Sequence, residues 1–179
     1  MTMCTQKREC LFGGAVYGRI RLNEIGKMVE KWWFEIIKKF QEVELDEYVT
    51  MPNHFHGIVV LVGADLRVCP DGGKGGHIGP PLQKPGANGQ AKRPALPNVI
   101  QWFKTMTTNE YLRNVKEKGW TPISQRLWQR NYFEHVIRSE ESLNKIREYV
   151  FTNPGLWETD PENPTVHVSD APLGKAVLF

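Results

Sequence analysis

Two histidines, His54 and His56, are the residues with the clearest chemical potential, and they lie in the stretch Tyr48–Leu61, YVTMPNHFHGIVVL. Side chains alternate between the two faces of a β-strand, so both imidazoles would point to the same side. Two neighbouring imidazoles can bind a divalent metal ion. The alternative is a pair of strand histidines without a ligand. The flanks favour the metal site, because a turn at Met51–Asn53 enters the strand and Gly57 leaves room beside the pair.

A catalytic metal ion needs further protein ligands, and a helix predicted near the end of the chain offers one. Tyr149 and Asn153 are spaced i, i+4 and would share a helix face. Asn153 would give an amide oxygen to the ion, and Tyr149 would present a phenol beside it. Two imidazoles and one amide suit Mg²⁺ or Mn²⁺, with substrate phosphate completing the shell. The alternative is that Tyr149 only packs within an amphipathic helix and has no chemical role.

The phenol would act as a nucleophile. A tyrosine has an ordinary pKa near about 10 and attacks poorly at neutral pH. A divalent ion would polarise a phosphate oxygen and hold the phosphorus in line with the attacking oxygen. The product would be a covalent phosphotyrosine, which divides one difficult step into two.

The elements that must position these groups follow from hydrophobic periodicity. Residues 1–6 form a short strand, 11–22 a hairpin or irregular excursion, and 22–40 an amphipathic helix capped by Asn23. The remaining predicted elements are two hairpin strands at 43–50 and 54–61, a helix from Asn98 to about 115, a strand at 128–137, and a helix from Ser139 to about 152.

This order predicts an α+β protein, a ferredoxin-like split βαββαβ sheet with an extra C-terminal helix that carries the tyrosine. The first and third strands are the central pair of such a sheet, so the histidines would lie on a rigid central strand. Residues 1–160 would form one domain. A Gly/Pro-rich insertion at about 63–97 would be flexible, and 161–179 would be an irregular tail.

Composition sets broad limits. A net charge of +3 and a pI of about 8.7 permit a nucleic-acid partner without requiring one. The three cysteines form no CxxC pair, which weighs against a disulfide framework or a zinc ribbon and suits the cytosol. No apolar run approaches about 18 residues, so we expect no membrane span. The N-terminus lacks an apolar export segment.

Three segments together carry a family resemblance: the histidine motif after Met51–Asn53, residues 127–138 (LWQRNYFEHVIR), and residues 146–154 (IREYVFTNP). In this order they resemble the REP-associated tyrosine transposase-like proteins, within the single-tyrosine HUH transposases. The likeness runs from about residue 3 to 160, interrupted by the Gly/Pro-rich stretch. It implies a ferredoxin-like fold and a cytoplasmic, nucleoid-associated enzyme that cuts and joins single-stranded DNA at hairpin-forming repeats.

The resemblance also implies residue roles. Tyr149 would attack a DNA phosphate, leaving a 5′-phosphotyrosine link and a free 3′-hydroxyl, while His54 and His56 would bind the divalent ion. Asn153 matches the position of the third ligand, which is a glutamine in related transposases. Tyr132 is a rival nucleophile on the predicted strand. Related transposases are dimers, and the REP-associated group leaves both monomer and homodimer open.

Basic and aromatic side chains near these segments would contact DNA, by phosphate neutralisation or by stacking on unpaired bases. The predicted DNA-binding residues are Arg126, Arg130, Tyr132, Arg138, Lys145 and Arg147. Two other functions compete with the transposase-like nuclease. One is a hairpin-DNA-binding module without catalysis, and the other is a phosphodiesterase that uses metal-activated water and does not need Tyr149.

Overall fold

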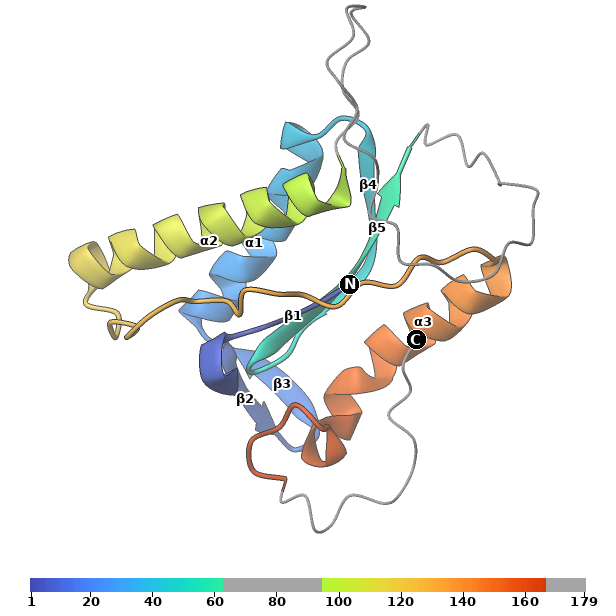
Figure 1. Cartoon of the computed structure of the whole chain (residues 1–179). Helices are drawn as coiled ribbons and strands as arrows, with labels where there is room; N and C mark the ends of the chain where they lie inside the picture. Colours follow the sequence, from blue (N-terminus) through green and yellow to red (C-terminus); the bar gives the residue numbers. More distant parts are fainter. Residues whose placement is uncertain (63–94, 167–179) are drawn as a thin grey trace, which may run out of the picture.

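A three-stranded antiparallel sheet, in the order β1–β5–β4, lies at the centre of this α+β protein (Figure 1). The computed structural model describes residues 1–62 and 95–166. The strands are β1 (Thr2–Cys4), β2 (Gly13–Val16), β3 (Arg19–Leu22), β4 (Val43–Thr50) and β5 (His54–Leu61), with β2 and β3 forming a separate hairpin. The helices are α1 (Glu24–Lys39), α2 (Leu96–Lys118) and α3 (Glu140–Thr152), with short 3₁₀ helices η1 (Gln6–Arg8) and η2 (Asn153–Thr159).

The β4–β5 hairpin has the bounds that the sequence predicts. β5 pairs with β4 on one side and with β1 on the other, so it is the central strand of the three. In the register with β1, Cys4 lies opposite His54 and Thr2 lies opposite His56. The two histidines therefore lie on the central strand, where β1 overlaps it.

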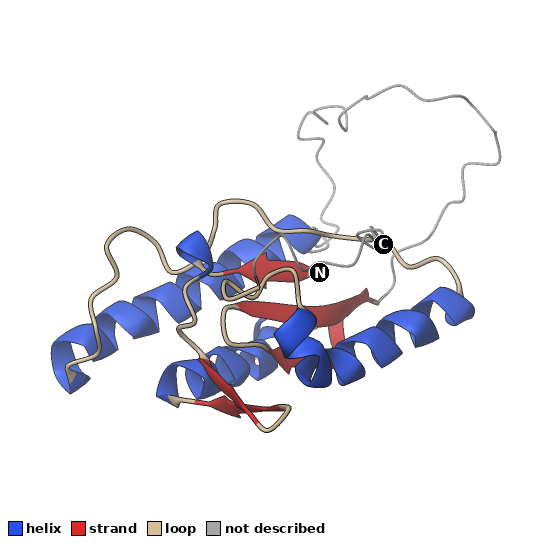
Figure 2. Ribbon diagram, turned by 90° about the horizontal axis from the view of Figure 1, so that it is seen from below, coloured by secondary structure: helices blue, strands red, loops and turns tan. Residues whose placement is uncertain are grey.

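Helices cover both faces of this sheet (Figures 1 and 2). α1 begins at the predicted cap, since the Asn23 side chain accepts hydrogen bonds from the backbone N–H groups of Ile25 and Gly26. α1 and α2 pack on the face to which Phe55 points, and α3 lies across the opposite face, which carries the histidines. None of the described helices is long and apolar enough to cross a membrane.

The main core lies between α1, α2 and the Phe55 face of the sheet. Trp33 of α1 is fully buried there, with its ring 4.9 Å from that of Phe55 and 6.2 Å from that of Phe103 on α2. Gly57 faces the same core, and a Cβ built on it would lie 2.6 Å from the Trp33 ring. Gly57 lies on the face of β5 opposite to the histidines. The space that we expected beside it for a ligand is therefore occupied by Trp33.

The fit between Gly57 and Trp33 makes a testable prediction. Gly57→Ala is expected to lower the free energy of unfolding by about 1–3 kcal/mol, because a rigid, fully buried indole must shift to admit the methyl group. Gly14→Ala, on a strand of the outer hairpin, is the matched control, since a Cβ added there would meet no atom within 4 Å. Urea denaturation of both variants measures the difference. Equal stabilities would contradict the prediction.

The strand predicted at 128–137 is not formed. Residues 127–133 run beside β1, but only two isolated bridges join them, Thr2 to Phe133 and Thr5 to Trp128. The chain advances five residues between these bridges while β1 advances three, so a regular ladder is impossible. The ammonium of Lys104 instead donates to the carbonyls of residues 129–131, and the buried Trp128 indole donates to the Thr107 hydroxyl.

The start of α2 also differs from the prediction. The cap is Ala95 rather than Asn98, because α2 begins at Leu96 and has Pro97 in its first turn, where a missing backbone N–H costs nothing. The end of the predicted insertion is thus helical. Its remaining part, 63–94, lies outside the described residues.

Candidate metal and tyrosine site

The two histidines lie side by side and are almost completely buried. Their ring centroids are 4.6 Å apart, with His54 0% and His56 7% exposed. Burial lowers the pKa of His54 to about 4, and burial together with the neighbouring His54 holds the pKa of His56 well below its usual range. Both imidazoles are therefore neutral at neutral pH, which is the form that binds metal ions.

Hydrogen bonds fix which ring nitrogen of each histidine is free. Asn53 donates its amide hydrogens to the carbonyls of Arg8 and Glu162, so its oxygen must face His54, whose Nδ1 lies 2.8 Å away and carries the proton. The Nδ1 atom of His56 contacts the Thr2 hydroxyl at 2.8 Å. The Nε2 atoms of both rings are buried without a hydrogen-bond partner. Oxygen partners on one ring nitrogen orient the other toward a metal ion in known metal sites.

α3 brings Tyr149 to these histidines, and Asn153 follows one helical turn later at the end of the helix. The Tyr149 ring centroid is 5.4 Å from that of His56, in an edge-on arrangement. Asn153, at the end of α3, is 2% exposed, and its side-chain oxygen is a third buried atom without a hydrogen-bond partner. The helix is held in place by the buried Val150 and by an ion pair between Arg147 and Asp46 of β4, with a shortest N–O distance of 2.6 Å.

The phenol of Tyr149 is 37% exposed and neutral at physiological pH. Burial and the carboxylate of Asp160 raise its pKa, and a hydrogen bond with the Asn153 side chain partly opposes the rise. A neutral phenol is a weak nucleophile, so the described residues alone do not activate it.

The chemistry of the three partnerless atoms fits a divalent metal ion. An unpaired buried polar atom is costly, and a cation shared by the two Nε2 atoms and the Asn153 oxygen would satisfy all three. In the part of the chain that the structure describes, no three His, Cys, Asp or Glu side chains form a group able to hold a metal. Among the described residues, His, Cys, Asp and Glu side chains alone thus do not complete a site on the histidine pair, and such a site needs the amide of Asn153 as well.

The structure adds a segment that sequence reasoning missed, the turn after α3. The Trp157 ring lies 6.1 Å from that of His54, and the Asp160 carboxylate lies 3.9 Å from His54 Nε2. Glu162 forms an ion pair with Arg8 at 2.7 Å. These residues stand in a proline-containing stretch without periodicity, and the only available signal was a tryptophan followed closely by three carboxylates.

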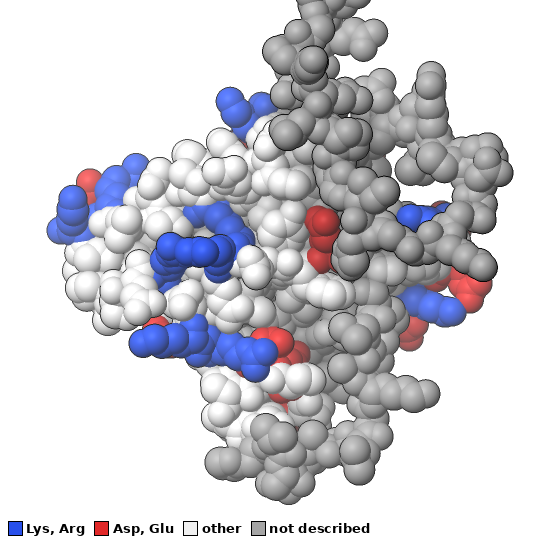
Figure 3. Space-filling view, in the orientation of Figure 1, with Lys and Arg blue, Asp and Glu red and all other residues white. Residues whose placement is uncertain are grey.

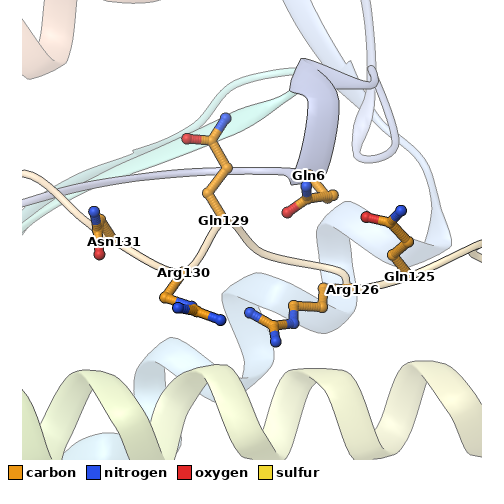
Figure 4. Close-up of a pocket in the computed structure, with 6 residues that line it drawn as sticks. All are labelled: Gln6, Gln125, Arg126, Gln129, Arg130 and Asn131. Carbon is orange, nitrogen blue, oxygen red and sulfur yellow. The ribbon is translucent and has the colours of Figure 1, made fainter.

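Arg126 and Arg130 line an open pocket of about 610 Å³. The other residues that line it are the amides Gln6, Gln125, Gln129 and Asn131 (Figure 4). Figure 3 shows Lys and Arg side chains gathered on the face of the molecule that is crossed by residues 125–131. Guanidinium and amide groups are those that contact phosphates and base edges in nucleic acids.

The other predicted DNA-binding residues are dispersed. Arg138 lines a second pocket of about 470 Å³, and Lys145 forms an exposed ion pair with Glu141. The ammonium of Lys104 lies over the ring of Tyr132, with 5.5 Å between Nζ and the ring centroid. Arg147 pairs with Asp46, so its guanidinium already anchors α3. Their contacts with DNA stay predictions.

No protein-family model matches this chain. The chain is 33% identical, over 160 residues, to an uncharacterized protein of Haemophilus influenzae, and the match covers 89% of this chain and 81% of that protein. This chain therefore belongs to the same family as the uncharacterized Haemophilus influenzae protein.

Proposed function

We propose that the protein is a metal-dependent single-stranded DNA endonuclease and strand transferase that acts at hairpin-forming repeats through Tyr149. One observation carries the proposal: a tyrosine from α3 lies against His56, one of two adjacent buried histidines whose Nε2 nitrogens have no hydrogen-bond partner. A phenol beside a set of atoms able to bind a metal ion is the arrangement needed for attack on a phosphodiester.

The sheet arrangement supports the finer fold assignment. Residues 127–133 lie along the edge of β1 that is not occupied by β5, which extends the order to segment 127–133, β1, β5, β4. β1 and β5 then form the central pair, as in a ferredoxin-like split βαββαβ sheet. This order is what the resemblance to the REP-associated tyrosine transposases implies.

His54, His56 and Asn153 would hold Mg²⁺ or Mn²⁺ in this proposal. A bound divalent ion would polarise a phosphate oxygen and stabilise ionised forms of nearby acids. The Tyr149 oxygen then forms a bond to the phosphorus, and the bond from phosphorus to the 3′-oxygen breaks. The 3′-oxygen leaves as a hydroxyl after accepting a proton, and the phenol proton is released to solvent. Attack of a 3′-hydroxyl on the phosphotyrosine reverses these changes and joins a strand.

The test uses the whole protein with Mn²⁺ and end-labelled single-stranded DNA from hairpin repeats flanking its gene. The expected product is a protein–DNA adduct that survives a denaturing gel, with a free 3′-hydroxyl on the other fragment. Cleavage without an adduct would support a phosphodiesterase that uses water. Binding without cleavage would support a hairpin-binding module. Either of these results would overturn the proposal.

The pocket of Arg126 and Arg130 gives a separate prediction on DNA affinity. Combined replacement of both residues with alanine is expected to lower the dependence of log K on log salt by about 0.7 for each phosphate that the protein no longer neutralises, because fewer counterions are released from single-stranded DNA. Fluorescence anisotropy across a salt series measures this slope. Arg113→Ala is the control, since that exposed arginine of α2 pairs with Glu110 and Glu117. An unchanged slope in the double variant would remove the pocket from the DNA path.

A further inference from the structure

Asp160 lies closest to His54 among the carboxylates described at the site. It is 6% exposed, and its Oδ2 atom is 3.9 Å from His54 Nε2. Its other oxygen accepts the backbone N–H of Glu162 at 2.7 Å, which fixes the orientation of the carboxylate.

The atoms that face each other here are both acceptors. The bond to Asn53 places the His54 proton on Nδ1, so Nε2 presents a lone pair to the Asp160 oxygen. The distance of 3.9 Å is too long for a hydrogen bond between them. Two buried acceptors that face each other are stabilised by a cation between them.

The spacing suits a shared ion. Ligand atoms at about 2.1 Å from one Mg²⁺ or Mn²⁺ are separated by at most about 4.2 Å, and the two atoms here lie within that limit.

The segment that carries Asp160 is held against the site on several sides. The Asn53 amide donates to the carbonyl of Glu162 at 2.6 Å, and the Asn163 side chain donates to the carbonyl of Trp157 at 2.9 Å. Trp157 itself is buried against the His54 ring. A carboxylate positioned in this way is prepared for binding, at little further entropic cost.

We propose that Asp160 is an additional ligand of the divalent ion, on the side of His54. This inference deepens the proposed function and rests on its metal site. It gives the site two nitrogens, one amide oxygen and one carboxylate, and the carboxylate favours hard cations such as Mg²⁺ and Mn²⁺. The ligand comes from the turn after α3, at the end of the predicted domain, so that turn belongs to the site.

The test is a Mn²⁺ titration of the whole protein followed by electron paramagnetic resonance, without DNA. Asp160→Asn is the variant, because it removes the charge and keeps an oxygen for the Glu162 N–H. Glu158→Gln is the matched control, since it removes an exposed charge from the same segment. Asp160→Asn is expected to raise the Kd for Mn²⁺ by about tenfold or more, and Glu158→Gln to change it by less than about twofold. Circular dichroism melts check that both variants fold.

The outcomes separate this inference from the function on which it rests. Wild-type binding that Asp160→Asn leaves within about twofold would overturn the role of Asp160 and leave the histidine site intact. Equal weakening in both variants would assign the effect to the charge of the segment, which also overturns the ligand role. Absence of Mn²⁺ binding by the wild type would overturn both proposals.

Discussion

Tyr149→Phe is expected to abolish the covalent DNA adduct and to reduce strand cleavage by a factor on the order of 10³ or more. The variant removes the only atom that forms the bond to phosphorus, while the ring that packs edge-on against His56 is kept. The fold should persist, because the phenol is partly exposed and a single hydrogen bond contributes about 1 kcal/mol. A denaturing gel with labelled DNA and Mn²⁺ measures both the adduct and the cleavage.

Tyr132→Phe is the matched control for this experiment. Tyr132 is a tyrosine of the second resemblance segment; its ring packs against the core, and it interacts with Lys104 and Glu134. Its replacement should leave the adduct intact. An adduct that survives in Tyr149→Phe and disappears in Tyr132→Phe would transfer the nucleophile to Tyr132. Mass spectrometry of the digested adduct identifies the modified peptide independently.

Much of the site could be predicted because its chemistry depends on short-range spacing. The i, i+2 rule placed His54 and His56 on one face, and the i, i+4 rule placed Tyr149 and Asn153 on another. Both rules hold whatever the tertiary structure is. That α3 packs against the histidine face of β5 is a prediction about tertiary structure. The short distance between the Tyr149 and His56 rings agrees with it.

The surroundings of the histidines could not be predicted in the same way. Asn53 precedes the strand and reads as a turn residue, yet it also bonds to Arg8 and Glu162, 45 and 109 residues away. Asp160 approaches His54 through a 3₁₀ turn that has no hydrophobic period. Such contacts depend on how distant segments meet, and no local pattern records them.

The segment 128–137 shows how composition alone misleads. Aromatic and β-branched residues raise strand propensity, but this propensity mainly reflects packing on a half-buried surface. Trp128 finds its packing in the core between Phe12 and Phe103, and Lys104 satisfies the neighbouring carbonyls. Trp128 therefore gains its burial, and residues 129–131 gain partners for their carbonyls, without a regular ladder.

His54→Asn is expected to remove Mn²⁺ binding and to reduce cleavage by a factor on the order of 10³. The asparagine amide can take over the place of Nδ1–H as donor to Asn53, whereas the Nε2 lone pair is lost. The variant thus deletes the metal-binding atom and keeps the bond that orients the site. Its stability without metal should stay near that of the wild type, apart from about 1–3 kcal/mol for the smaller side chain in a fully buried position.

Thermal unfolding with and without Mn²⁺ separates metal binding from catalysis. At a free Mn²⁺ concentration of about 100 times Kd, binding should stabilise the wild type by about 2.7 kcal/mol, which corresponds to roughly 5–10 °C in Tm for a chain of this size. His54→Asn should show no such shift. His135→Ala, at an exposed histidine outside the site, should shift like the wild type. A full Mn²⁺ shift in His54→Asn would mean that the ion binds elsewhere, because no atom of the asparagine side chain reaches the position of Nε2.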